Sequence, residues 1–169
     1  MLATKTVNGL HLSDKEFATR LIQLAEAELW VREKTGHNDG KRVEEYLATV
    51  GLKKGNPYCA AFVSFIFKQA GYQLPRTGWS PSLFPTSRLV KAAAPGNVFG
   101  IFFPGIKRIG HCGFVTGIHN DWVNTIEANT NAAGSREGDG VFRRLRHKRA
   151  LAALADWLRV GTEKKGRKP

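Results

Sequence analysis

The sequence predicts one α+β domain in which N-terminal helices pack on a small antiparallel sheet. Two observations predict this class. Helical patterns fill the first half of the 169 residues, and short runs rich in aromatic and β-branched residues fill the second half. The length suits one domain with a substantial core. We expect this domain to span residues 1–160, with a disordered basic tail at 161–169.

The first two helices are predicted from capping and breaking signals. Ser13 and Glu16 have the spacing of a capping box, so a helix should begin directly after Ser13 and run to about Glu33. The segment RVEEYLATV predicts a second, shorter helix that Gly51 ends. Both helices have an apolar face that must pack against the rest of the domain.

The third helix is predicted from GNPYCAAFVSFIF, residues 55–67, which is apolar on nearly every side and should be buried. Asn56 suits the N-cap and Pro57 the first helical position. Cys59 then lies in the first turn, where the helix dipole favours the thiolate over the thiol. The backbone N–H groups of this turn also point toward any oxyanion formed there. The alternative is that Cys59 is an ordinary buried core cysteine.

A long proline-rich loop, PRTGWSPSLFPTS, follows the third helix at residues 75–87. Loops of this length in compact domains are often binding loops, so we expect it to line a substrate groove. Trp79 has two interpretations of equal weight: it contacts the substrate, or it packs on the core.

Four runs in the second half predict consecutive antiparallel strands, because each is short, aromatic and β-branched and is bounded by Gly, Asn or Asp. They are NVFGIFF at 97–103, GHCGFVTGI at 110–118, DWVNTIEAN at 121–129 and GVFRRLR at 140–146. The segment KRALAALADWL, residues 148–158, predicts a last helix.

Strand alternation indicates which side chains share a face. His111 alternates with Gly113, which leaves room for a partner, whereas Cys112 takes the opposite face and is interpreted as core. Glu127 and Asn129 share a face of the next strand. A carboxylate and an amide beside a histidine can hold the imidazole in one tautomer. Each residue alone has an ordinary structural interpretation, but together with the helix-start cysteine they give the order of a cysteine hydrolase.

The blocks NPYCAAFVSFIFKQAG, GHCGFVTGI and NTIEANTN resemble the three signature blocks of CHAP amidase/endopeptidase domains, within the NlpC/P60 group of papain-like peptidoglycan hydrolases. The resemblance covers about residues 26–146. It implies a papain-like fold and cleavage of amide bonds in cell-wall peptides. It further implies Cys59 as nucleophile, His111 as general base and acid, Glu127 as the residue that orients His111, and Asn129 as a fourth polar residue.

The sequence departs from the family pattern at two positions. Tyr58 stands where tryptophan is more frequent, and Cys112 follows the histidine where an aliphatic residue is usual. Both changes are mild, and we expect Tyr58 together with Trp79 to bind substrate. Which amide is cut stays open, because an N-acetylmuramoyl-L-alanine amidase and an endopeptidase use the same residues.

We expect neither a cofactor nor a metal ion. The two cysteines and five histidines lack the spacing of a zinc site. Some relatives in this family carry calcium, and HNDGK offers Asp39 as an oxygen donor. One acid beside a lysine is a poor calcium ligand set, since calcium prefers several carboxylate and carbonyl oxygens.

The net charge of +12 indicates an anionic partner such as nucleic acid, anionic lipid or a bacterial cell wall. A solvated basic face that keeps the protein soluble is the alternative. No helix-turn-helix or RNA-binding aromatic motif supports specific nucleic-acid binding. We expect a monomer that binds peptidoglycan, with a cognate inhibitor or immunity protein as a further candidate partner.

The first residues lack a signal-peptide pattern, and no apolar run is long enough to cross a bilayer. We expect synthesis in the cytoplasm and action at the cell wall or periplasm of a target or host bacterium, as a phage lysin or a secreted antibacterial toxin. Two alternatives are kept: a cytosolic thiol acyltransferase or deamidase on the same scaffold, and a basic nucleic-acid-binding protein with a coincidental triad.

Overall fold

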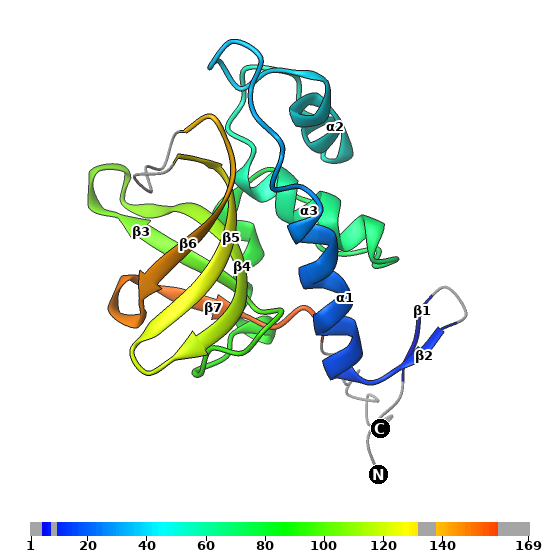
Figure 1. The fold of residues 1–169 in the computed structure, drawn as a ribbon. Helices are drawn as coiled ribbons and strands as arrows, with labels where there is room; N and C mark the ends of the chain where they lie inside the picture. The colour runs from blue at the N-terminus through cyan, green and yellow to red at the C-terminus, as the bar shows by residue number, and fades with distance from the viewer. Residues whose placement is uncertain (1–4, 8–9, 132–137, 159–169) are drawn as a thin grey trace, which may run out of the picture.

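The computed structural model describes residues 5–7, 10–131 and 138–158 (Figure 1). The tail predicted at 161–169 lies outside the described residues. Within them, three α-helices accompany a five-stranded antiparallel sheet, which confirms the predicted α+β class. A short hairpin that the sequence pattern did not predict precedes the helices: β1 (Lys5–Val7) and β2 (Leu10–Leu12).

Helix α1 (Asp14–Glu26) begins at the predicted capping box. Ser13 N–H donates to the Glu16 carboxylate at 2.7 Å, and Ser13 Oγ accepts from the Glu16 N–H. The helix ends earlier than predicted, because Glu28 turns into the core and accepts hydrogen bonds from side chains of α2 (Lys41–Thr49). Interactions with a distant segment therefore outweigh local helix propensity at this end.

Helix α3 (Cys59–Gln69) is the buried helix that the sequence predicted, with every residue from 59 to 67 buried. Its predicted cap is wrong. Tyr58 occupies the N-cap position and Pro57 precedes it, while the Asn56 amide donates to a backbone carbonyl of the preceding loop at 2.8 Å. Cys59 is consequently the first helical residue, so its predicted place in the first turn is confirmed.

The sheet has the order β6-β5-β4-β3-β7, with every neighbouring pair antiparallel. Its strands are β3 (Val98–Phe103), β4 (Arg108–His119), β5 (Trp122–Thr130), β6 (Gly140–His147) and β7 (Ala153–Ala155). The four predicted strands are all present. Figure 1 shows the sheet strongly curled, with α1 and α3 along one side of it.

The predicted last helix at 148–158 is wrong. The segment forms a single 3₁₀ turn at Lys148–Ala150 and then the strand β7, in which Leu154 pairs with Phe99 of β3. The helix propensity of an alanine-rich sequence is worth only a few tenths of a kcal/mol per residue. Pairing of residues 153–155 with the open edge of β3 outweighs it, because this pairing satisfies backbone hydrogen-bonding groups of both strands.

The core lies between the helices and one face of the sheet. Phe62 of α3 packs edge-on against Phe114 of β4, with ring centroids 6.0 Å apart. A smaller cluster of Phe99, Val115 and Val123 covers the other face. Among the described helices, none combines the length and the hydrophobicity needed to cross a membrane.

Candidate active site

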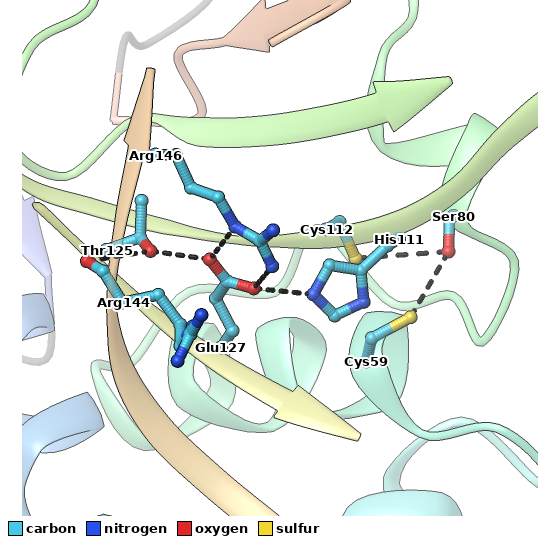
Figure 2. A network of polar contacts seen from close by, with 8 residues as sticks. All are labelled: Cys59, Ser80, His111, Cys112, Thr125, Glu127, Arg144 and Arg146. Atoms are coloured by element: carbon cyan, nitrogen blue, oxygen red, sulfur yellow. Dashed lines mark hydrogen bonds and ion pairs between the residues drawn. The ribbon is translucent and has the colours of Figure 1, made fainter. Parts of the chain in front are cut away.

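Cys59 lies at the N-terminal end of α3, at one end of a network of polar side chains (Figure 2). The first backbone hydrogen bond of the helix runs from Phe62 N–H to the Tyr58 carbonyl at 2.8 Å. The N–H groups from Cys59 to Ala61 precede this bond and carry the positive end of the helix dipole. The thiol is therefore placed where a thiolate and an oxyanion are both stabilised.

His111 and Glu127 meet across β4 and β5. His111 Nε2 lies 2.8 Å from Glu127 Oε2, and both side chains are buried. Gly113 pairs directly with Glu127, and a Cβ at Gly113 would lie 3.1 Å from Glu127 Cγ and 2.6 Å from the Ile126 carbonyl oxygen. The predicted room beside the histidine is thus present, and the carboxylate occupies it.

Two residues that the sequence analysis missed hold the Glu127 carboxylate. Arg146 of β6 donates to both oxygens, with Nη2 2.6 Å from Oε2 and Nε 2.9 Å from Oε1, and Thr125 Oγ1 donates to Oε1 at 2.5 Å. Burial alone would raise the pKa of Glu127, but the hydrogen bonds from Arg146 and His111 outweigh burial and lower this pKa to about 2. Glu127 is therefore a buried carboxylate fixed in its charged form.

The imidazole of His111 is turned so that Nδ1 faces Cys59 (Figure 2). Nδ1 makes no hydrogen bond of ordinary geometry with any described residue, so it is left for the thiol. Burial lowers the pKa of His111, but its interactions with Cys59 and Glu127 outweigh burial and raise this pKa to about 9. The shift of the His111 pKa therefore favours the imidazolium, which in turn favours the Cys59 thiolate.

A serine and a second cysteine adjoin the thiol. Ser80 Oγ lies 3.4 Å from Cys59 Sγ, and Cys112 Sγ lies 3.9 Å from the same Ser80 oxygen. Interaction with the Cys112 thiol is the largest cause that lowers the pKa of Cys59 well below its usual range, followed by His111 and then Ser80, all acting against burial. Cys112 is a core residue as predicted, but it is wrong to exclude it from the site, because its sulfur and that of Cys59 both lie beside Ser80 Oγ.

Replacing Cys112 by alanine should therefore raise the pKa of Cys59 without removing activity. We expect kcat/KM at pH 8 to fall by less than about fivefold, the worth of one neutral hydrogen bond. Following alkylation by iodoacetamide against pH reports the thiol titration directly. An unchanged alkylation profile, or a loss of activity as severe as that of Cys59→Ala, would contradict this role.

Asn129 does not contact His111. It sits at a bulge of β5 in the left-handed region, with φ 58°, which asparagine tolerates better than most residues. Its Oδ1 accepts from the Tyr58 N–H at 3.0 Å, and its Nδ2 donates to Asn38 Oδ1 at 3.0 Å. Asn129 thus fixes the backbone that leads into Cys59, and the predicted sharing of a face with Glu127 is lost at the bulge.

The predicted substrate contact by the Tyr58 side chain is wrong. Tyr58 is fully buried, and its ring packs beside Tyr46 with centroids 6.2 Å apart. The N-cap position turns the side chain into the core while the next residue faces the site. Its aromatic character therefore serves packing rather than binding.

A cleft of about 400 Å³ opens beside Cys59. The predicted loop forms one wall, and the end of α2 and the start of β4 form others. The residues that line it are Val50, Leu52, Asn56, Pro57, Cys59, Thr77, Gly78, Trp79, Ser80, Arg108 and Gly110. Trp79 is 51% exposed, so of its two interpretations the structure favours the one in which it is open to a substrate.

Among the described residues, no three side chains of the types His, Cys, Asp and Glu are grouped to hold a metal ion. The Asp39 carboxylate instead accepts from the Thr35 N–H at 2.9 Å and from Thr35 Oγ1 at 2.8 Å. These bonds stabilise the charged form, and they lower the pKa of Asp39. Asp39 therefore closes a loop.

We expect activity to survive removal of divalent cations, because thiolate and imidazolium alone supply the chemistry described for this site. The measurement compares initial rates in EDTA, before and after calcium is added back. A rate lost in EDTA and restored by calcium would contradict this expectation.

A scan against protein-family models found no match for this chain, and searches of curated proteins and of solved structures found none either.

Proposed function

We propose that this protein is a cysteine hydrolase that cleaves an amide bond in bacterial peptidoglycan peptides, on a papain-like scaffold of the CHAP kind. One observation carries the proposal. Cys59 at a helix N-terminus faces His111, whose other nitrogen is held by the buried Glu127, and the thiol opens on a cleft. A nucleophile, a base and an orienting carboxylate in this order form the arrangement used for acyl transfer through a covalent intermediate.

The first half of the reaction forms an acyl-enzyme. The Cys59 thiolate attacks the amide carbonyl carbon, and the carbonyl oxygen becomes an oxyanion that the Cys59 N–H stabilises. Ser80 Oγ, 3.4 Å from the sulfur, is a second donor within reach of this oxygen. His111 then gives its Nδ1 proton to the leaving nitrogen, so the C–N bond breaks and a free amine departs.

The second half of the reaction releases the acyl group. His111, now neutral, takes a proton from a water molecule, and the resulting hydroxide attacks the thioester. The C–S bond breaks, a carboxylic acid leaves, and the thiolate and imidazolium are restored. Glu127, itself held by Arg146, keeps Nε2 bonded throughout, so the ring presents Nδ1 to the substrate in both halves.

Peptidoglycan is favoured as the substrate class by the resemblance of the three blocks and by the net charge of +12, which concentrates the protein on an anionic wall. The nucleic-acid alternative is supported by charge alone. An acyltransferase or deamidase would use the same three residues, so only its products separate it from a hydrolase. Delivery as a phage lysin or a secreted toxin, with action at the cell wall, belongs to the same proposal.

Digestion of purified peptidoglycan followed by mass spectrometry tests the proposal. A hydrolase releases fragments with a new amine and a new carboxylate. A free L-alanine amine and a lactyl carboxylate identify an amidase, and a break within the stem or cross-bridge identifies an endopeptidase. Release of ammonia without chain scission identifies a deamidase. Intact peptidoglycan after prolonged incubation of the reduced protein would refute hydrolysis.

A further inference from the structure

We propose that Arg108 and Trp79 form a subsite beside Cys59 that binds a carboxylate of the substrate. This inference rests on the proposed function, because it takes the substrate to be a peptide bound in the cleft at Cys59. It adds a chemical requirement that the catalytic residues do not impose: a negative charge close to the amide that is cut.

Arg108 is held in a fixed position at the first residue of β4. Its guanidinium lies over the Trp79 ring, 3.9 Å from the centroid, and its Nη1 donates to the Ile109 carbonyl at 3.0 Å. Stacking and one hydrogen bond restrict a side chain that otherwise has many rotamers. Most of the five N–H donors of the guanidinium are still available to a ligand.

The charge of Arg108 has no acidic partner within the described residues. Other arginines of the domain do: Arg42 pairs with Glu28 at 2.5 Å, Arg143 with Glu26 at 2.8 Å and Arg146 with Glu127 at 2.6 Å. The lining residues of the cleft include no acid, and several of them are apolar. An unpaired guanidinium against such walls attracts an anion more strongly than one in open water does.

Arg108 and the catalytic histidine belong to the same strand, β4, and Arg108 lines the same cleft as Cys59. The position of the cation relative to the reacting carbonyl is therefore set by one rigid element. Gly78 brings the loop onto this wall, since a Cβ there would lie 2.4 Å from Leu52 Cδ1. The planar guanidinium fork matches a carboxylate in two parallel hydrogen bonds, and the apolar walls suit the methyl groups of alanine residues.

A stem peptide offers two sources of this carboxylate. One is the free α-carboxylate of a glutamate linked through its γ-carboxyl, and the other is the C-terminal carboxylate. Three synthetic tetrapeptides separate them: one with both carboxylates free, one amidated at the glutamate α-carboxyl, and one amidated at the C-terminus. Calorimetric titration into the inactive Cys59→Ala protein gives a Kd for each.

We expect amidation of one of the two carboxylates to weaken binding by about 10- to 100-fold, the usual worth of a charge-assisted hydrogen-bonded pair. The peptide whose binding is weakened identifies which carboxylate the subsite binds. Adding Arg108→Gln to the Cys59→Ala protein should make the Kd values of the three peptides equal. Arg88→Gln is the matched control, because Arg88 also stacks on a tryptophan, Trp157, at 5.0 Å, but does not line the cleft. It should leave the difference unchanged.

Equal Kd values for the three peptides, absence of measurable binding, or discrimination that survives Arg108→Gln would overturn the subsite. Binding to Cys59→Ala is measured without turnover. If the peptides bind with different Kd values that depend on Arg108, but the wild-type protein cleaves none of them, the subsite is supported and the hydrolase is rejected. If the wild-type protein cleaves the peptides but binds all three equally well, the hydrolase is supported and the subsite is rejected.

Discussion

Replacing Cys59 by alanine is expected to abolish amide cleavage, with kcat/KM lowered by more than about 10⁴-fold, as when the nucleophile of a catalytic triad is removed. No described side chain can take its place in attack, because Ser80 lacks contact with the base and Cys112 has its pKa raised by burial and by Cys59. The fold should persist, since alanine suits the first turn of a helix and only one sulfur atom is lost. Release of amines from peptidoglycan measures the activity.

The matched control for this variant is Cys112→Ala, which removes the same atom from a position that is also buried. Both variants should unfold at similar urea concentrations, so a difference in activity reports chemistry rather than stability. An active Cys59→Ala protein beside an inactive Cys112→Ala protein would reverse the assignment of the nucleophile.

Replacing Glu127 by glutamine should lower kcat by roughly 10³-fold with a smaller effect on KM, because catalytic carboxylates of this kind stabilise the imidazolium. The pKa of His111 should fall from about 9, since Glu127 is one of the two groups that raise it. The alkaline limb of the rate profile follows His111 and should move to lower pH. The rate of alkylation of Cys59 at neutral pH should fall as well, since a less charged imidazole stabilises the thiolate less.

Removal of Glu127 alone takes away the carboxylate that Arg146 bonds at 2.6 Å, and breaking a buried pair can cost several kcal/mol of folding stability. The double variant Glu127→Gln/Arg146→Met removes both charges and so separates catalysis from folding. It should unfold near the wild-type urea concentration and still be slow. Wild-type turnover in the double variant would show that Glu127 is only a structural carboxylate.

The two buried ionisable groups also make stability depend on pH in opposite directions. The pKa of Glu127 is lowered from 4.5 to about 2, so its stabilisation is present above pH 4.5 and lost as the pH falls toward 2. The pKa of His111 is raised from 6.5 to about 9, so its stabilisation is present below pH 6.5 and lost as the pH rises through 9. The free energy of unfolding of the double variant, measured with urea, should lose the part of the acid dependence that Glu127 contributes.

Local signals predicted the parts of the site that depend on neighbours in the chain. The burial of α3 follows from its composition, and the opposite faces of His111 and Cys112 follow from the period of a strand. The space for Glu127 was predicted because Gly113 alternates with His111. Each of these predictions depends only on the sequence of one helix or strand and of the element that follows it.

The parts that sequence reasoning missed depend on pairing between distant segments. Arg146 lies opposite Val123 and reaches along β6 to Glu127, which requires the register of β5 with β6. The bulge that rotates Asn129 and the pairing that makes residues 153–155 a strand have the same origin. The one available signal for Ser80 was its place in the predicted binding loop, and its contact with Cys59 depends on how that loop folds back.

His111, Glu127 and Arg146 come from three adjacent strands, β4, β5 and β6, so the row of charges runs across the sheet. A slip of one residue in either pairing would send a member of the row to the opposite face. Synthesis proceeds from the N-terminus, and Cys59 therefore exists long before the arginine that completes the row. Under the proposed function, the row that holds His111 stays incomplete until β6 has paired with β5 in register, so the site can be completed only after residue 146 has been synthesised.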